Sequence, residues 1–199
     1  MDDESFLLEQ LSKRFPPAVH RTNPEGMTYI AVDAVIGRLN EATPYWDTHV
    51  QIVLGPTSEG VPTTRSGKPQ FITAAVLSLY IPGLGTRVGA GSNTNFDADT
   101  SIKGAVSQAL KKAAQQFGVG LYLADAEERA AMSLEMAAAR PGASLQELKD
   151  AVFARAKRLD PAVNDGASCA RALGVDITDL QDTDRLRAIL AAADEGSNT

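Results

Sequence analysis

The chain has 199 residues, of which 44% are hydrophobic, and a formal net charge of −6 with a pI near 4.9. This apolar content suffices for a globular core and excludes a disordered chain, while the acidity argues against non-specific nucleic-acid binding by the chain as a whole. The acidity is uneven, because residues 1–124 hold 10 Lys and Arg against 11 Asp and Glu, whereas residues 125–199 hold 9 against 14.

Cys169 is the single cysteine, so an internal disulfide is impossible, which suits a reducing cytoplasm. The acidic N-terminus, MDDESFLLEQL, lacks the basic start and apolar run of a signal peptide. Apolar stretches all fall short of the ~20 residues that a membrane span needs. We therefore expect a soluble, cytoplasmic protein.

The first forty residues predict two short helices. A helical pattern over 5–14 ends before Pro16, and a short strand is possible at 28–31. Asp33 can then cap a second helix, whose apolar side chains as far as Leu39 face inward.

Three later segments predict an antiparallel sheet. Residues 45–54 alternate between apolar and polar side chains, as a half-exposed strand does. Residues 71–81 are apolar on nearly both faces and therefore predict the central strand, and residues 86–91 form a third strand rich in glycine. The first two strands are joined by a loop at 55–69 rich in Gly, Pro, Ser and Thr.

Residues 100–124 predict one long amphipathic helix. Apolar residues recur at steps of three and four on one expected buried face: Ile102, Val106, Ala109, Leu110, Ala113 and Phe117. Another face carries residues that fall four apart: Lys103, Ser107, Lys111 and Gln115. Lys112 and two glutamines lie beside them, and the sequence has no acidic residue between Asp99 and Asp125. This basic stripe is either a solvated face or a surface for a phosphate backbone.

The remaining residues predict helices only. We interpret residues 1–124 as one domain, 125–143 as a helical linker and 144–199 as a small helical domain with a disordered end. The last of these begins with a capping box formed by Ser144 and Glu147. The order of elements predicts an α+β fold, in which the long helix packs on the antiparallel sheet and an all-helical region follows.

Motifs of catalysis and cofactor binding are missing. The sequence has no phosphate-binding loop, no zinc ligand set at a usual spacing and no nucleophile elbow, so we expect a protein that is not an enzyme and needs no metal or cofactor. Asp97 and Asp99 flank the start of the long helix, where capping explains them. A hydrolase that uses these two carboxylates and a metal on DNA is the alternative.

Three stretches together resemble the Rad-fifty-two-type single-strand annealing proteins of homologous recombination, including phage and bacterial relatives. The first is Tyr29-Ile30 followed by VIGRLNE from Val35, and the second is Tyr45-Trp46. The third and most specific is KGAVSQALKKAAQQFGVG from Lys103. The resembling part runs from about residue 8 to residue 123.

The resemblance implies a β-β-β-α core whose strands continue from subunit to subunit in a homo-oligomeric ring. Single-stranded DNA would lie in a basic groove outside that ring, and complementary strands would anneal without nucleotide hydrolysis. Lys111 and Lys112 match the paired DNA-binding cations of the family, and Arg21 matches the basic residue before the Tyr-Ile segment. Such a protein would act in DNA recombination and repair in a bacterial cell or, if encoded by a phage, in its host.

Two positions depart from the family pattern. Gln115 stands where eukaryotic members place an arginine, and Leu121 where several bacterial relatives have one. The groove would therefore hold DNA more weakly or would recruit Arg65, Lys68 and Arg87 from the hairpin. Lys103 and Gln115, on the same helix as Lys111 and Lys112, are also candidate DNA-binding residues. The C-terminal region would bind a single-strand-binding protein or an exonuclease, or would act as an acidic flap against non-specific DNA. A protein that coats or protects single strands without annealing them is the alternative function.

Overall fold

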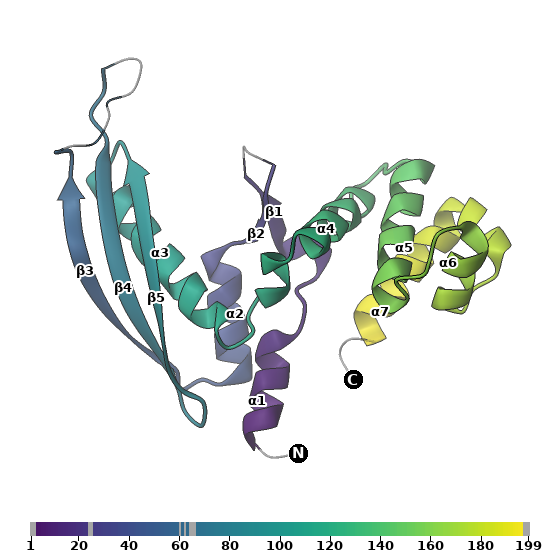
Figure 1. The fold of residues 1–199 in the computed structure, drawn as a ribbon, viewed down its shortest axis with the longest axis horizontal. Coiled ribbons are helices and arrows are strands. Elements are labelled where there is room, and N and C mark those ends of the chain that lie inside the picture. Colours follow the sequence, from purple (N-terminus) through teal and green to yellow (C-terminus); the bar gives the residue numbers. More distant parts are fainter. Residues whose placement is uncertain (1–2, 24–25, 60, 62, 64–66, 197–199) are drawn as a thin grey trace. The chain divides into compact units, whose positions relative to one another are not determined.

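The computed structural model describes residues 3–23, 26–59, 61, 63 and 67–196. The chain forms two compact units: Met1–Lys13 with Ala31–Leu121, and Arg14–Ile30 with Tyr122–Thr199. The first unit contains a three-stranded sheet and the longest helix, and the second contains a short hairpin and the C-terminal helices (Figure 1). Within the described residues, each helix is too short or too polar to cross a membrane.

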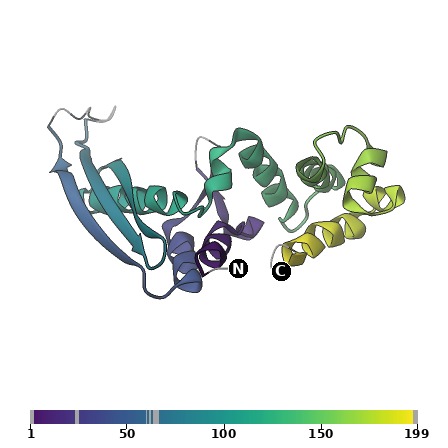
Figure 2. The same ribbon diagram turned by 60° about the horizontal axis from the view of Figure 1, so that its bottom comes forward.

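The sheet of the first unit is antiparallel with the order β3-β4-β5. Its strands are β3 (Asp47–Thr57), β4 (Phe71–Ile81) and β5 (Gly85–Asn95). Helix α3 (Ala98–Gln115) lies along one face of this sheet, as both views show (Figures 1 and 2). The unit also contains α1 (Asp3–Ser12) and α2 (Val32–Ala42). The α+β architecture predicted from the sequence is confirmed.

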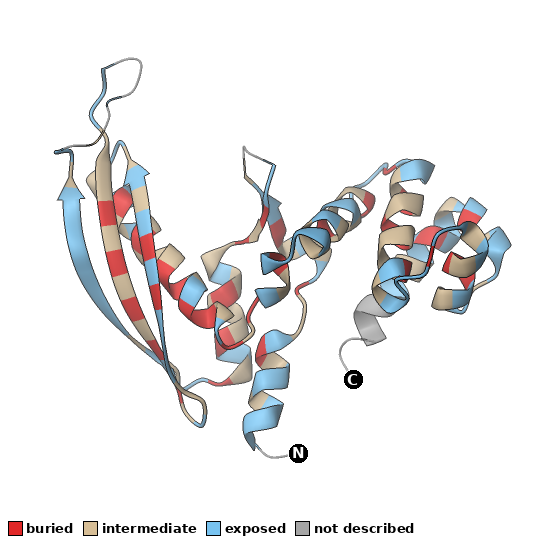
Figure 3. Cartoon of the chain, in the orientation of Figure 1, coloured by how far each residue is buried: buried red, intermediate tan, exposed pale blue. Residues whose placement is uncertain are grey.

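The central position of β4 is confirmed, with the predicted bounds. Alternate residues of this strand are buried under α3, from Thr73 to Ile81, and the residues between them are mostly half-buried (Figure 3). The edge strand β3 is exposed along nearly its whole length. Burial in the sheet therefore depends on α3, which covers β4 and β5 far more than β3.

Two glycines of β5 allow α3 to lie unusually close to the sheet. A Cβ atom at Gly91 would lie 2.3 Å from the carbonyl oxygen of Ala105, and one at Gly89 would lie 2.1 Å from that of Ala109. Both distances are far below van der Waals contact, so any side chain here would push the helix away. The third strand is glycine-rich because helix backbone occupies the space of its side chains.

The long helix is shorter than predicted. It ends at Gln115 rather than at residue 124, because Gly118 and Gly120 adopt positive φ angles of 95° and 65°, which end a right-handed helix. A 3-10 turn, η2 (Leu121–Ala124), follows.

The predicted buried face of α3 is confirmed at Ala109, Leu110, Ala113 and Phe117 but differs in the first half of the helix. Ser101 and Ala105 are completely buried, whereas Ile102 and Val106 are only half-buried. The hydroxyl of Ser101 donates to the carbonyl oxygen of Asn93 at 2.8 Å and lies 2.9 Å from the hydroxyl of Thr73, so its burial leaves no unmet hydrogen bond. Small residues face the sheet here because the glycines of β5 bring the helix so close.

Other differences concern the ends of elements. β3 begins at Asp47 rather than at residue 45 and ends at Thr57 rather than at residue 54, and β5 extends beyond the predicted 86–91 at both ends, since ladder pairing with β4 continues almost to both ends of that strand. Asp33 does not cap α2: the N-cap is Ala31, and Asp33 lies in the first turn.

The second unit contains a two-stranded hairpin and helical elements. The hairpin pairs β1 (His20–Thr22) with β2 (Thr28–Ile30) after a short 3-10 turn, η1 (Pro17–Val19). The helices are α4 (Ala126–Ala138), α5 (Leu145–Leu159), α6 (Gly166–Leu173) and α7 (Thr183–Gly196), with the 3-10 turn η3 (Ile177–Gln181).

The C-terminal helices begin and end at capping groups, of which the box at Ser144 was predicted. The capping box of Ser144 and Glu147 is present in α5, and Gly174 ends α6 in a left-handed conformation. The apolar side chains of these helices form one core with Leu148, Val152 and Leu186 at its centre. The expectation of a disordered end was wrong for residues 195–196, which are helical, and residues 197–199 lie outside the described part.

Candidate nucleic-acid interface

Lys111 and Lys112 occupy the last turns of α3. Lys112 is exposed, whereas Lys111 is half-buried, and this burial lowers the pKa of its ammonium group. A charge held in a partly apolar environment is stabilised by an anion placed against it, so Lys111 is suited to binding a phosphate.

Arg87 lies at the same end of the first unit as these lysines. Gly91 faces Ala105 and Gly89 faces Ala109, so α3 runs antiparallel to β5 and its last turns lie beside the start of that strand. The guanidinium of Arg87 packs over the ring of Phe117, 5.2 Å from its centroid.

A second contact ties the last turn of α3 to the same strand. The side-chain amide of Gln116 donates to the carbonyl oxygen of Val88 at 2.6 Å. Gln116 follows Lys112 by one turn and Val88 follows Arg87 directly, so both cations flank this hydrogen bond. Gln115 is half-buried in the same turn. The structure thus gathers Arg87, Lys111, Lys112 and Gln115, which we call the basic end.

Two other candidate residues belong to the opposite end of the sheet. Lys103 is exposed near the start of α3, where its charge contributes to a lowered pKa of Asp97. The larger cause of that shift is a pair of hydrogen bonds from Thr100 to the Asp97 carboxylate. Lys68 is exposed three residues before β4, whose first residue, Phe71, pairs with the last residue of β5. Lys103 is therefore separated from Lys111 by eight residues of α3, about 12 Å along the helix axis, and Lys68 belongs to the same end of the sheet as the start of α3.

The last two candidates are not placed relative to these groups. Arg21 is exposed on β1 of the second unit, where it pairs with Tyr29 across the hairpin. Arg65 lies outside the described residues.

The acidic residues at the start of α3 have a structural role. Asp97 is the N-cap of the helix and accepts the backbone N–H of Thr100 at 2.7 Å, as its sequence position predicts, and Asp99 lies in the first turn. Within the described part of the chain, His, Cys, Asp and Glu side chains do not gather in a group that could hold a metal ion.

The structure also shows the surroundings of Arg38 and Tyr45, two residues from the stretches that resemble the family. Arg38, from the VIGRLNE stretch, donates to the carbonyl oxygens of Gln10 and Lys13 and so closes the C-terminal end of α1. Tyr45 has an exposed side chain, 77% accessible, so it is not part of the core. The sequence already showed this aromatic residue but could not show its exposure.

A polar cluster in the second unit had no signal in the sequence, because its members are more than 100 residues apart. The hydroxyl of Tyr122 lies 2.7 Å from Nε2 of His20 and accepts the backbone N–H of Phe15 at 3.3 Å. The guanidinium of Arg14 packs over the Tyr122 ring and pairs with Glu128. These contacts join the segment before β1 to η2 and α4.

Comparison with known protein families matches residues 3–140 to the Rad52/22 family double-strand break repair protein. Comparison with curated proteins found no match. The family match covers more than half of the chain, and it confirms the resemblance seen in the sequence and extends it through α4. Together with the sheet and α3, it associates the chain with DNA repair and recombination. The chain therefore belongs to the Rad52/22 family of double-strand break repair proteins.

Proposed function

We propose that this protein binds single-stranded DNA and anneals complementary strands without hydrolysing nucleotides. The observation that carries the proposal is the basic end, where Arg87 of β5 and Lys111 and Lys112 of α3 lie at the same end of the first unit although the chain as a whole is acidic. Contacts from cations to phosphates leave base edges free to pair, as annealing requires. Pairing two strands makes and breaks no covalent bond, so a catalytic group is unnecessary.

A few cations per subunit bind a long strand tightly only if many subunits act together. Linked sites raise affinity through effective concentration, so a ring that repeats the basic end compensates for a modest site. We propose that the ring forms through strand β3, which pairs with β4 on one side only among the described strands. Its exposed side chains include Val50, Ile52, Val53 and Leu54, each at least 40% accessible, and such an edge favours pairing with another chain.

The test measures affinity for a fluorescent oligothymidine as a function of salt. The double variant Lys111→Gln/Lys112→Gln should bind at least about tenfold more weakly, and its logarithmic salt dependence should flatten by about 0.7 for each phosphate that a subunit no longer neutralises. The matched control is Lys157→Gln, which removes an exposed lysine of α5 in the second unit. Equal affinity and equal salt slope in the double variant and the control would refute the proposed role of the basic end.

A second assay distinguishes annealing from coating. Complementary oligonucleotides labelled with a donor and an acceptor fluorophore should pair faster when the protein is added without ATP. A protein that only coats or protects single strands would slow the pairing, and that result would replace annealing by the alternative function. Electron microscopy with and without DNA tests the ring, since a monomer under both conditions excludes it.

A further inference from the structure

Arg87 lies on the face of the sheet that α3 covers, just beyond the end of that helix. It pairs across the ladder with Leu79, which is buried on this face, and side chains two residues apart on a strand point to the same face. One row along β5 therefore consists of Gly91, Gly89 and Arg87. The backbone of α3 occupies the side-chain space at both glycines, and at Arg87 the helix has ended, so a long side chain fits there.

Two contacts hold the guanidinium of Arg87 in place. Its central carbon lies over the ring of Phe117, 5.2 Å from the centroid, and Nη1 donates to the carbonyl oxygen of Thr86 at 3.1 Å. Phe117 is buried, whereas Arg87 is exposed. One side of the guanidinium therefore covers the ring, and the other side faces solvent. Neither contact within the described part of the chain involves a carboxylate.

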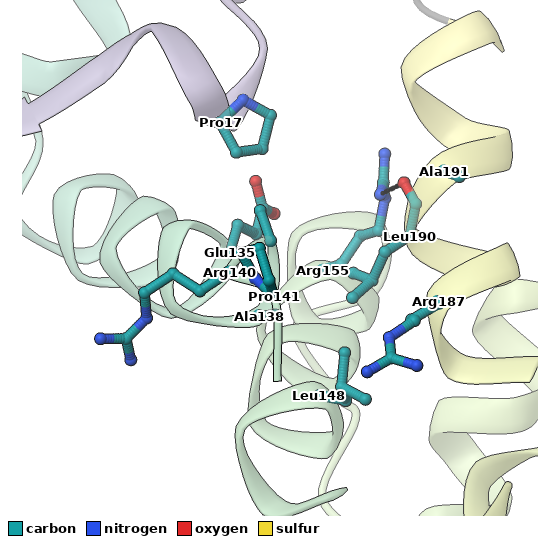
Figure 4. Close-up of a pocket in the computed structure, with 11 residues that line it drawn as sticks. Pro17, Glu135, Ala138, Arg140, Pro141, Leu148, Arg155, Arg187, Leu190 and Ala191 are labelled. Atoms are coloured by element: carbon teal, nitrogen blue, oxygen red, sulfur yellow. Dashed lines mark hydrogen bonds between the residues drawn. The ribbon is translucent and has the colours of Figure 1, made fainter. Parts of the chain in front are cut away.

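Arginines of the second unit are held differently. At the cavity shown in Figure 4, Nη1 of Arg155 donates to the carbonyl oxygen of Leu190 at 2.8 Å and so ties α5 to α7. Arg140 lines the same cavity and pairs with Glu147 at 2.7 Å. These guanidinium groups bind oxygen atoms and connect helices, whereas that of Arg87 covers an aromatic ring at the surface.

A guanidinium held in this way is suited to an unpaired base. It is planar and weakly hydrated, and it stacks on aromatic faces. Unpaired bases in turn stack on guanidinium planes as well as on aromatic side chains. A pyrimidine or purine can therefore cover the side of Arg87 that faces solvent.

Lys112 supplies a phosphate contact close to Arg87. It is exposed, and it directly precedes Ala113, whose backbone nitrogen would lie 2.5 Å from a Cβ atom at Gly89. Arg87 is two residues from Gly89 along β5, which is about 7 Å. A strand whose phosphate binds Lys112 thus brings a base within reach of Arg87.

We propose that Arg87 stacks on a base of the single strand rather than binding a phosphate. This inference rests on the proposed DNA function and assigns one contact within it. Phe117 and Thr86 orient the guanidinium before DNA binds, which reduces the entropy lost in the contact. Stacking uses the face of a base and leaves its Watson–Crick edge open to a complementary strand, so the contact is compatible with annealing.

The test compares two fluorescent strands that carry equal charge, an oligothymidine and an abasic strand with the same number of phosphates. The salt concentration is set so that the full-length parent protein binds both. Arg87→Lys keeps the positive charge but lacks the planar group. It should bind oligothymidine at least about fivefold more weakly than the parent, while its affinity for the abasic strand and its salt slope should stay the same.

The matched control is Arg171→Lys, which changes an exposed arginine of α6 in the second unit and should bind both strands within about twofold of the parent. Arg87→Gln is a second variant, because it removes the charge as well as the planar group. The ratio of oligothymidine affinity to abasic affinity should fall in both Arg87 variants. Urea titration of Trp46 fluorescence verifies that they are folded.

Two results would overturn the base contact and leave the DNA function standing. Equal oligothymidine affinity of Arg87→Lys and the parent would show that only the charge matters at this position. An equal loss on both strands would show a phosphate contact or a structural role. A parent protein that binds neither strand would refute the proposed function itself, and the base contact with it.

Discussion

The helices of the second unit and helix α3 of the first differ in how their cations are distributed among carboxylates. In the second unit, arginines pair with carboxylates: Arg14 with Glu128, Arg158 with Glu128 and Glu135, and Arg140 with Glu147. In the first unit, α3 carries three lysines along a stretch that has no acidic residue between Asp99 and Asp125. Paired cations hold helices together, whereas cations in a stretch without carboxylates are suited to an external anion. The total charge of the chain therefore says little about which surface binds DNA.

The units also differ in how their cores are built. α3 packs against β5 through backbone contacts at glycines, whereas the C-terminal helices pack through larger side chains such as Leu148 and Leu186. The chain's single tryptophan, Trp46, lies in the first unit. Its fluorescence thus reports the unfolding of that unit, while circular dichroism at 222 nm reports the helices of both.

The largest expected effect breaks the close contact of the first unit. Gly91→Val places a branched side chain where even a Cβ atom would lie 2.3 Å from the carbonyl oxygen of Ala105. We expect a loss of at least about 3 kcal/mol in the free energy of unfolding, because neither backbone can yield easily. Urea titration of Trp46 fluorescence measures it.

The control for this variant is Gly37→Ala. A Cβ atom at Gly37 would meet no atom within 4 Å, and alanine favours the helix α2. This variant should unfold at an equal or higher urea concentration. A Gly91→Val protein as stable as the parent would show that α3 and β5 are not packed so closely.

A second prediction concerns the pH dependence of the free energy of unfolding, because each unit contains one of the two histidines, His49 in the first and His20 in the second. Burial lowers the pKa of His20, and the nearby charge of Arg14 adds to the shift. Nδ1 of His20 lies 3.0 Å from the carbonyl oxygen of Pro16 and donates to it, so neutral Nε2 accepts the hydroxyl of Tyr122. Protonation of Nε2 removes that acceptor.

Because the folded pKa lies below the unfolded value near 6.5, the unfolded state binds the proton first as pH falls. The contribution of His20 to the free energy of unfolding is present in full above pH 6.5 and is lost as pH falls toward the folded pKa. The free energy of unfolding should fall by at most about 1.4 kcal/mol per pH unit over this range. Urea titrations at 222 nm between about pH 7.5 and 5.5 should show this slope. His20→Gln should abolish it, whereas His49→Gln, at an exposed position of β3, should preserve it. An equal slope in both variants would contradict the assignment.

The smallest expected effect concerns the capping box of α5. The hydroxyl of Ser144 accepts the backbone N–H of Glu147 at 3.2 Å, so Ser144→Ala should cost about 1 kcal/mol of helix stability. The change should move the 222 nm transition and leave that of Trp46 fluorescence in place. A matched shift of both transitions would show that the two units unfold together.

Sequence patterns predicted those features that depend on neighbouring residues. The cap at Asp97 and the box at Ser144 require contacts within a few residues, and the strand over 71–81 is signalled by its own continuous apolar run; all three are confirmed. Sequence patterns failed where packing against residues distant in the chain, or the backbone conformation of a glycine, outweighed the local apolar periodicity. The helix over 100–124 kept its apolar period past Gly118, but a positive φ ended it. The apolar period correctly predicted burial from Ala109 to Phe117, whereas close packing on the glycines of β5 buries Ser101 and Ala105 in place of Ile102 and Val106.

The amino-acid sequence by itself determined the order of the main elements, the caps at Asp97 and Ser144 and the lysine stripe, because these follow from periodicity and from side chains a few positions apart. Only the tertiary structure decided that Arg87 joins Lys111 and Lys112 while Lys68 and Lys103 stay at the other end of the sheet. The physical reason is that α3 runs antiparallel to β5 at a distance that only glycine permits, and no local pattern encodes the partner against which a helix packs.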